Sequence, residues 1–160
     1  MTNNLPIQIR PYRLSDQSHI GQLFYDTVHT VNRKDYTQHQ VDAWAPDTSK
    51  TGQFPRPLEK NYSYIAEKNG LIIGFGDISS DGYLDRLFVH KDFQRCGVAS
   101  KLLKVLESKA KDLHLTEITT EASITAKPFF LAKGYLVKEE QVKVVKDTTL
   151  TNFKMYKKIS

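Results

Sequence analysis

The stretch of this 160-residue chain with the clearest chemical potential runs from Leu87 to Lys101. Its first residues predict a strand that ends at Val89, and the pattern after Gly97 predicts the start of a helix. The first turn of a helix has unpaired N–H groups and the positive end of the helix dipole, so it attracts phosphate. Gly97 and Ala99 carry almost no side chain, which lets an anion approach the backbone. The stretch therefore indicates a phosphate or pyrophosphate site, with an ordinary strand–helix turn as the alternative.

Side chains beside the predicted helix start add to this site. Gln94, Arg95 and Ser100 can donate hydrogen bonds to an anion, and Arg95 also supplies positive charge. The single cysteine, Cys96, stands at the same place and raises the hypothesis of a thiol nucleophile. The pattern pairs no histidine with Cys96, so we do not assign it that role.

The elements before this stretch follow from periodicity and turn residues. Alternation at Ile7–Arg10 predicts a first strand, and apolar residues at three- and four-residue steps after Ser15 predict an amphipathic helix with Ser15 as N-cap. Thr37 and Gln40 form a capping box that opens a short second helix. The prolines and glycine of Pro46–Asn61 predict a loop.

A three-stranded antiparallel meander is expected next. The segments 62–68 and 71–79 are joined by Asn69-Gly70, a strong hairpin signal. Asp81-Gly82 is a second such turn and leads into a strand at 83–90. This third strand is the one that enters the candidate phosphate site.

The period then changes to that of a helix. An apolar stripe from Val98 to Leu113 predicts a helix, and 117–122 predicts a strand after it, which together make one parallel βαβ unit. Ser123 or Thr125 can cap a further helix that stops at Gly134.

The last segments, 135–145 and 152–158, are expected to form an antiparallel pair. The order β-α-α-β-β-β-α-β-α-β-β predicts an α/β (α+β) fold in which a mixed, mostly antiparallel central sheet has one parallel unit and helices on both faces. The length suits a single domain over 1–160.

Composition excludes several classes of function. The N-terminus lacks a long apolar run, so we expect neither a signal peptide nor a membrane anchor, and we expect a cytoplasmic protein. One cysteine excludes an internal disulfide and a cysteine-based zinc site, and we expect no metal. The net charge of +5 permits an anionic partner. The basic residues are dispersed and match no nucleic-acid-binding motif, so nucleic acid is only a third hypothesis.

The pattern Gln94-x-x-Gly97-x-Ala99 after the strand 87–90 resembles the Q/R-x-x-G-x-G/A motif of the GNAT superfamily of N-acetyltransferases. Residues 126–135 look like the A-x-x-F-Y-E-x-x-G-F segment of that family, and 151–155 look like its closing strand. The resemblance covers residues 7–159. It implies an enzyme that moves an acetyl group from acetyl-CoA to a primary amine by direct attack on the thioester.

The resemblance also implies where coenzyme A would lie. Backbone N–H groups of residues 94–100 would hold the pyrophosphate, and the strand edge at 87–89 would pair with the pantetheine amides and polarise the thioester carbonyl. Ser123 and the helix after it would line the far side of the pantetheine slot, with Lys133 at the nucleotide phosphate. The expected cofactor-binding residues are Leu87, Phe88, Val89, Gln94, Arg95, Cys96, Gly97, Val98, Ala99, Ser100, Ala126, Phe129, Phe130 and Lys133.

Attack needs a neutral amine, whereas a lysine-like amine has a pKa of about 10, so a proton acceptor is required. Asp85 and Glu121 stand on predicted strands, and Asp85, two residues before Leu87, is expected on the same face as Leu87 and Val89. Each is a candidate base or amine anchor, and each could instead face solvent or pair with Arg86 or a lysine.

The leaving thiolate also needs a proton. Many relatives have a tyrosine where this chain has Phe130, so the usual acid is missing. Water, Ser123 or Tyr135 could replace it, although a thiolate with a pKa of about 8.5 leaves tolerably without help. This departure keeps open a non-catalytic acyl-CoA binder or sensor of the same fold.

The acceptor pocket is expected in the region 27–46, with His29, Tyr36 and Trp44 as candidate substrate-binding residues. Each of them could equally be a packing residue. The acceptor itself, whether a small molecule, a peptide N-terminus or a protein lysine, stays open. Exposed strand edges are compatible with a homodimer.

Overall fold

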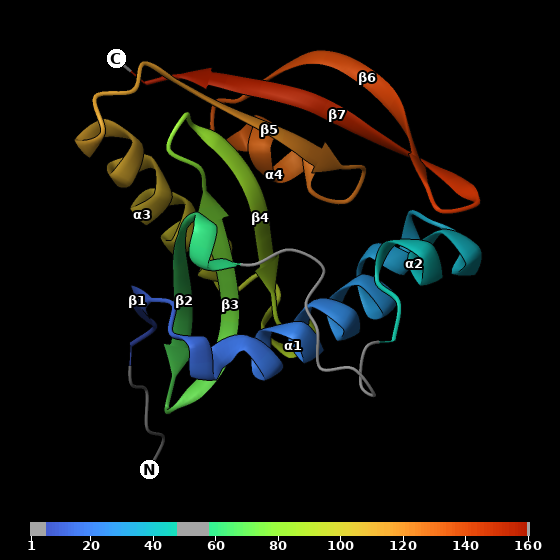
Figure 1. Cartoon of the computed structure of the whole chain (residues 1–160), viewed down its shortest axis with the longest axis horizontal. Helices are drawn as coiled ribbons and strands as arrows, with labels where there is room; N and C mark the ends of the chain where they lie inside the picture. Colours follow the sequence, from blue (N-terminus) through green and yellow to red (C-terminus); the bar gives the residue numbers. More distant parts are fainter. Residues whose placement is uncertain (1–5, 48–57, 160) are drawn as a thin grey trace.

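The computed structural model describes residues 6–47 and 58–159, so most of the predicted 46–61 loop lies outside the described residues. Seven strands form one sheet in the order β1-β2-β3-β4-β5-β7-β6 (Figure 1). The pair β4–β5 is parallel and the other described pairs are antiparallel, which confirms the predicted fold class. The strands are β1 (Gln8–Pro11), β2 (Tyr62–Lys68), β3 (Leu71–Ile78), β4 (Tyr83–Val89), β5 (Glu117–Ser123), β6 (Leu136–Val145) and β7 (Thr148–Lys158).

The described residues contain four α-helices between these strands: α1 (Gln17–Thr30), α2 (Gln38–Trp44), α3 (Val98–Asp112) and α4 (Lys127–Ala132). The β2–β3 hairpin turns at Asn69 and Gly70, with φ of 54° and 77°, so both residues have the positive φ that its tight turn requires. The capping box of α2 is present, because Thr37 Oγ1 accepts from the Gln40 N–H and the Gln40 side chain accepts from the Thr37 N–H. The predicted order of elements is confirmed.

The predicted N-cap of the first helix is wrong. Ser15 lies inside a 3-10 turn (Leu14–Asp16), and α1 begins at Gln17 with Asp16 as its N-cap residue. The carboxylate of Asp16 accepts from the Arg13 N–H and forms two hydrogen bonds with the Arg10 guanidinium. This charged contact with β1 fixes the entry to the helix, and the hydrogen bond with Arg10 lowers the pKa of Asp16.

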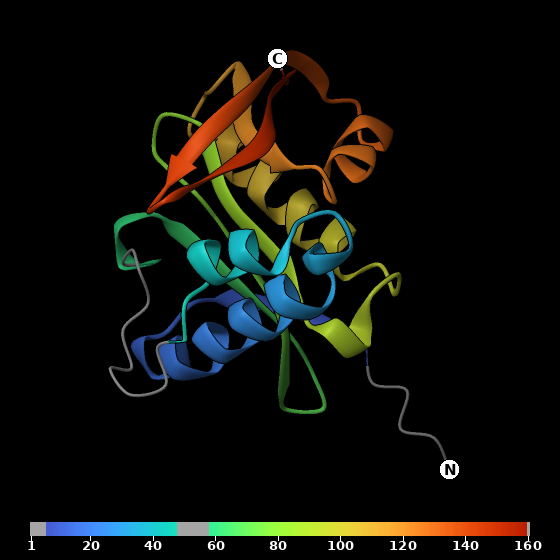
Figure 2. The ribbon, with the colours of Figure 1, turned by 90° about the vertical axis from the view of Figure 1, so that its right-hand side faces the viewer.

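The sheet is covered by helices on both faces. Helix α3 packs on β2, β3 and β4, while α1 crosses the opposite face with α2 beside it (Figure 2). Two glycines of β3 let α3 approach: a Cβ at Gly74 would lie 2.9 Å from Val98 Cγ1, and one at Gly76 would lie 3.1 Å from Leu106 Cδ1. This close packing fixes the start of α3 beside the end of β4, where the phosphate site is predicted.

Among the described residues, no helix is both long enough and apolar enough to cross a membrane.

Candidate active site

The site begins where β4 and β5 part. The two strands pair in register only at Tyr83–Thr119 and Leu84–Thr120, and within the described chain β4 has no ladder partner on this side beyond Leu84. The Thr120 hydroxyl donates to the Leu84 carbonyl (2.8 Å) at the last paired position. Because the strands diverge beyond this point, the backbone edge of β4 faces a cavity instead of a neighbouring strand.

A β-bulge lies at the same place on the other side of β4. Asp77 of β3 pairs with Arg86, and Ile78 pairs with Leu84, so Asp85 is an extra residue in β4. The expectation of regular alternation from Asp85 to Leu87 is therefore wrong. Leu84 and Leu87 both pack in the cluster around α3, although they are three residues apart. Sequence alternation carries no signal for such an insertion.

The parting of the strands opens a cavity of about 730 Å³ between β4, β5, α1, α2 and the start of α3. It is lined by the predicted catalytic residues Asp85, Glu121 and Ser123, and by Tyr36 and Trp44. It is also lined by all the predicted cofactor residues except Cys96 and Lys133. One concave site thus gathers residues from most of the chain.

The cradle end of the cavity is formed by residues 93–100. Gly97 precedes α3 with φ of 83°, a left-handed conformation that disfavours other residues, and a Cβ there would meet no atom within 4 Å. The Gln94 amide donates to the Val89 carbonyl (2.7 Å), which ties this loop to the end of β4. The side chain predicted to contact an anion thus shapes the loop, while the helix start stays open to a ligand.

The acceptor end of the cavity has an aromatic wall. Trp44 contacts Phe24, Tyr36 and Phe88, with ring centroids 6.5, 5.5 and 6.1 Å away. Val31, Val145 and Leu150 extend this apolar lining. The rings come from α1, α2, the segment between them and β4, so the wall requires long-range packing.

Tyr36 joins this wall to the far side of the cavity. Its hydroxyl donates to the Thr151 carbonyl of β7 (2.7 Å) and accepts from the Ile124 N–H (2.8 Å), just after β5. Burial raises the pKa of the Tyr36 hydroxyl. Tyr36 was expected to bind substrate; both hydrogen bonds of its hydroxyl instead hold the wall in place.

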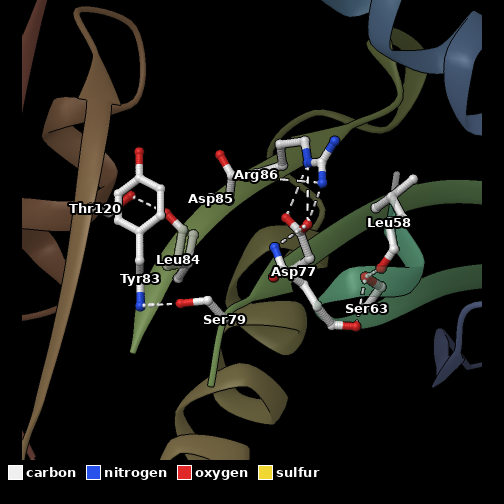
Figure 3. Close-up of polar contacts among 10 residues, drawn as sticks. Leu58, Ser63, Asp77, Ser79, Tyr83, Leu84, Asp85, Arg86 and Thr120 are labelled. Carbon is white, nitrogen blue, oxygen red and sulfur yellow. Dashed lines mark hydrogen bonds and ion pairs between the residues drawn. The ribbon is translucent and has the colours of Figure 1, made fainter. Parts of the chain in front are cut away.

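The carboxylate of Asp85 stands beside a buried ion pair that sequence reasoning missed. Arg86 Nη2 donates to Asp77 Oδ2 (2.6 Å), and the side chains are 5% and 0% exposed, respectively. Figure 3 shows Arg86 turned to Asp77 beside the bulge, with Tyr83 and Asp85 on the same strand. Arg86 Nη2 also lies 3.9 Å from Asp85 Oδ2. Arg86 lines the cavity, and so does Tyr83, which adds a hydroxyl that the sequence pattern does not indicate.

Glu121 of β5 forms an ion pair across the cavity wall. Lys143 of β6 donates to Glu121 Oε1 at 2.6 Å. Burial acts to raise the pKa of Glu121, but the hydrogen bond and positive charge of Lys143 outweigh it and lower that pKa. This is the alternative that the sequence leaves open for Glu121, pairing with a lysine, and the pair makes Glu121 an anchor for a cation more readily than a base.

The position of the missing tyrosine is filled by packing. Phe130 is 3% exposed and packs against Phe129 and Tyr135. The Tyr135 hydroxyl donates to Glu107 (2.8 Å), outside the cavity lining, so Tyr135 does not reach the site. The Ser123 hydroxyl does line the cavity and accepts from the Ala126 N–H (3.0 Å).

Three predicted site residues lie outside the cavity lining. His29 Nε2 donates to the Ala45 carbonyl (2.8 Å), and its ring stacks on Tyr25. Cys96 is an exposed free thiol. Lys133 is exposed with its ammonium near the Phe129 ring.

Comparisons with known proteins agree with this geometry. The family model for the acetyltransferase (GNAT) domain matches residues 32–157. The chain is 36% identical over 151 residues to the uncharacterized N-acetyltransferase YafP of Escherichia coli (strain K12), covering 93% of this chain and 94% of that protein. The chain belongs to the GNAT family. It is therefore an acyltransferase, as the resemblance implied.

Solved GNAT structures share the fold. A GCN5-related N-acetyltransferase from Rhodopseudomonas palustris superposes with a TM-score of 0.90 at 27% identity, over 99% of both chains. The PaiA N-acetyltransferase of Thermoplasma acidophilum, solved with coenzyme A, has a TM-score of 0.75 at 17% identity, over 97% of this chain and 100% of that one.

Proposed function

We propose that this GNAT enzyme transfers an acetyl group from acetyl-CoA to a primary amine inside the cavity between β4 and β5. The open helix start at Gly97, continuous with the diverging strands, is the observation that carries this proposal. Backbone N–H groups of residues 94–100 and the charge of Arg95 would hold the pyrophosphate. Two solved structures of this fold, PaiA from Thermoplasma acidophilum and YncA from Salmonella typhimurium, contain coenzyme A and acetyl-CoA, respectively.

The pantetheine arm would run between the edge of β4 and the start of α4. Leu87, Ala126 and Phe129 line the cavity there and supply an apolar slot. Backbone groups of β4 beyond Leu84 have no ladder partner from β5, so they can pair with the amides of the arm and polarise the thioester carbonyl. The thioester supplies the electrophilic carbonyl carbon when acetyl-CoA is bound.

We assign different roles to the carboxylates of Asp85 and Glu121. We assign Asp85, at the bulge, to accept the proton of the acceptor ammonium, directly or through water. Glu121, whose pKa is lowered by Lys143, would hold the ammonium in place. Ser123 lines the cavity next to Glu121 on the same wall and is our candidate to protonate the leaving thiolate.

The cofactor half of the proposal is tested by calorimetry with acetyl-CoA on wild type and Gly97→Trp. The indole should fill the cradle and abolish binding. Gly70→Trp is a matched control, because Gly70 also has a positive φ (77°) and a Cβ there also meets no atom within 4 Å. Absence of binding to wild type, or equal losses in both variants, would overturn the assignment of the cradle.

The catalytic half is tested by acetyl-CoA consumption over a panel of amines with Asp85→Asn and Asp85→Ala. Loss of turnover with retained acetyl-CoA binding would support Asp85 as the base. Tight cofactor binding by wild type with no turnover on any amine would favour the second candidate, a non-catalytic acyl-CoA sensor. The observation behind that candidate is Phe130, buried where relatives carry a hydroxyl.

We also propose that residues 1–160 act as one N-acetyltransferase domain in the cytoplasm, where a free exposed thiol such as Cys96 is ordinary.

A homodimer would form through β6, a ten-residue sheet edge with Val142 and Val144 65% and 74% exposed. Antiparallel pairing about Gln141 would set Glu139 of each copy against Lys143 of the other. Sedimentation of Val144→Lys, with Leu71→Lys as the control on the exposed hairpin, tests this interface.

A further inference from the structure

The acceptor end of the cavity contains chemistry that narrows the class of amine. Its lining joins three features that the transfer reaction alone does not require: a continuous aromatic wall, acids that each already have a cation beside them, and a buried oxygen without a partner. This inference rests on the proposed function, because it concerns the amine that receives the acetyl group.

The wall favours an apolar body on the acceptor. Trp44 touches three other rings and is only partly buried, so its remaining surface faces the cavity. Phe88 of the same wall lies on β4, three residues beyond Asp85 at the bulge. A ligand whose ammonium reaches Asp85 or Glu121 therefore has its body beside these rings, where apolar surface is stabilised by leaving water.

The charges disfavour an acceptor with several cations. At this end the cavity is lined by three cations, Lys34, Arg86 and Lys143, and by two acids, Asp85 and Glu121; the buried Asp77 also holds Arg86, so the charges balance. Each acid already has a cation near it: Arg86 Nη2 at 3.9 Å and Lys143 Nζ at 2.6 Å. A second ammonium on the ligand would meet no uncompensated acid among the described lining residues. Polyamines and lysine-rich peptides thus fit this end poorly.

One polar group is placed to receive a single ammonium. Asn152 lines the cavity, and its Oδ1 is buried with no hydrogen-bond partner within the described part of the chain. Asn152 pairs with Ser123 across the β5–β7 ladder, which places it two residues from Glu121 along that wall. Asn152 Oδ1 is closed off in this structure, so it would meet a ligand N–H only after its side chain turns toward the cavity; because a buried acceptor without a donor is costly, that turn would be favourable.

We propose that the acceptor is a primary amine with one positive charge on an apolar, flat body, of the arylalkylamine kind. Glu121 and Asn152 would receive its N–H groups, Trp44 and Phe88 would contact its body, and Lys34 at the rim would repel polycations. The acetyl step is balanced: the ammonium gives one proton to Asp85, the neutral nitrogen forms a bond to the acetyl carbon as the carbon–sulfur bond breaks, and the second amine proton is lost to water while Ser123, reprotonated from water, protonates the leaving thiolate.

The chain contains a single tryptophan, so the fluorescence of Trp44 reports occupancy of this end directly. The test titrates 2-phenylethylamine and putrescine into the protein saturated with coenzyme A, with excitation where tyrosine does not absorb. A saturable change is expected with 2-phenylethylamine, at an affinity roughly tenfold or more above that of putrescine, the scale that burial of a phenyl ring supplies. Equal or tighter binding of putrescine, or no change with either amine, would overturn the proposal.

A pair of variants tests how the charge of Lys34 affects the preference between the two amines. Lys34→Glu should narrow the preference for 2-phenylethylamine over putrescine, because an acid at the rim attracts the second ammonium. Arg33→Glu makes the same change in charge on the neighbouring residue, which is exposed but does not line the cavity, and should leave the preference unchanged. Equal shifts in both variants would contradict a local role for Lys34.

These readouts separate this inference from the proposed function. Failure of acetyl-CoA to bind in calorimetry removes the transferase assignment whatever the amine does. If acetyl-CoA binds and is consumed with putrescine but not with 2-phenylethylamine, the enzyme assignment survives and the acceptor class is wrong.

Discussion

The two ends of the cavity are built in opposite ways. The cradle end comes from one continuous segment, residues 93–100, whose shape depends on a single glycine with a positive φ and on the start of α3. The acceptor end takes its side chains from α1, α2, β4, β5, β6 and β7. A cofactor common to a family can be held by a local backbone shape, whereas the acceptor is recognised by side chains that only tertiary packing assembles.

The largest loss of stability is expected when the buried Asp77–Arg86 pair beside the acceptor end is broken. Arg86→Met leaves the Asp77 carboxylate buried without its cation, which should cost about 3–5 kcal/mol of unfolding free energy in urea titrations. The double variant Asp77→Asn, Arg86→Gln removes both charges and should recover most of this loss. If the single variant is as stable as wild type, the pair does not support the strand that carries Asp85.

A smaller loss of stability is expected from a change at Tyr36, and its effects on ligand binding should distinguish the acceptor end from the cradle end. Tyr36→Phe leaves the Ile124 N–H and the Thr151 carbonyl without their partner, at a cost of about 1–3 kcal/mol. The KM for the amine should rise, while the affinity for acetyl-CoA should stay unchanged because the cradle is untouched. Tyr25→Phe is the matched control, and its stability should equal that of wild type. A loss of acetyl-CoA affinity in Tyr36→Phe would show that the ends are coupled.

The pH dependence of kcat/KM should show which carboxylate, Asp85 or Glu121, accepts the proton of the amine. The pKa of Glu121 is held below its ordinary value of 4.5, so its charged form and its contribution to stability are present above that value and are lost as pH falls through the lower folded pKa. An acid limb of kcat/KM in the neutral range therefore cannot come from Glu121. Lys143→Met should raise the pKa of Glu121 without moving a neutral limb; movement of that limb would assign it to Glu121.

The smallest effect is expected within the cradle segment itself. Cys96 is exposed and does not line the cavity, so Cys96→Ser should leave acetyl-CoA affinity and turnover within error of wild type. Substantial loss of turnover with intact binding would restore the thiol nucleophile that the sequence pattern did not support.

The features that could be predicted from the sequence are local, as at the cradle end, whereas those that could not are built from separate elements, as at the acceptor end. Hairpin turns, the α2 capping box and the glycine before α3 are signalled by neighbouring residues, because local sterics and hydrogen bonds determine them. The Asp77–Arg86 pair, the Glu121–Lys143 pair and the role of Tyr36 depend on contacts between separate elements. His29 and Tyr36 are both polar aromatics in the expected acceptor region, and nothing in their local sequence distinguishes a residue that packs from one that lines a cavity.

The bulge at Asp85 has a consequence for insertions and deletions in the gene. Substitutions around the cavity change one contact each, but deletion of the codon for Asp85 would restore a regular ladder between β3 and β4. Leu84 and Leu87 share a face although they are three residues apart, and without Asp85 they would be two residues apart, so the faces of the strand would be kept while the bulge and the carboxylate were lost. We therefore expect deletion of Asp85 to leave the fold and acetyl-CoA binding intact while it removes the proposed base.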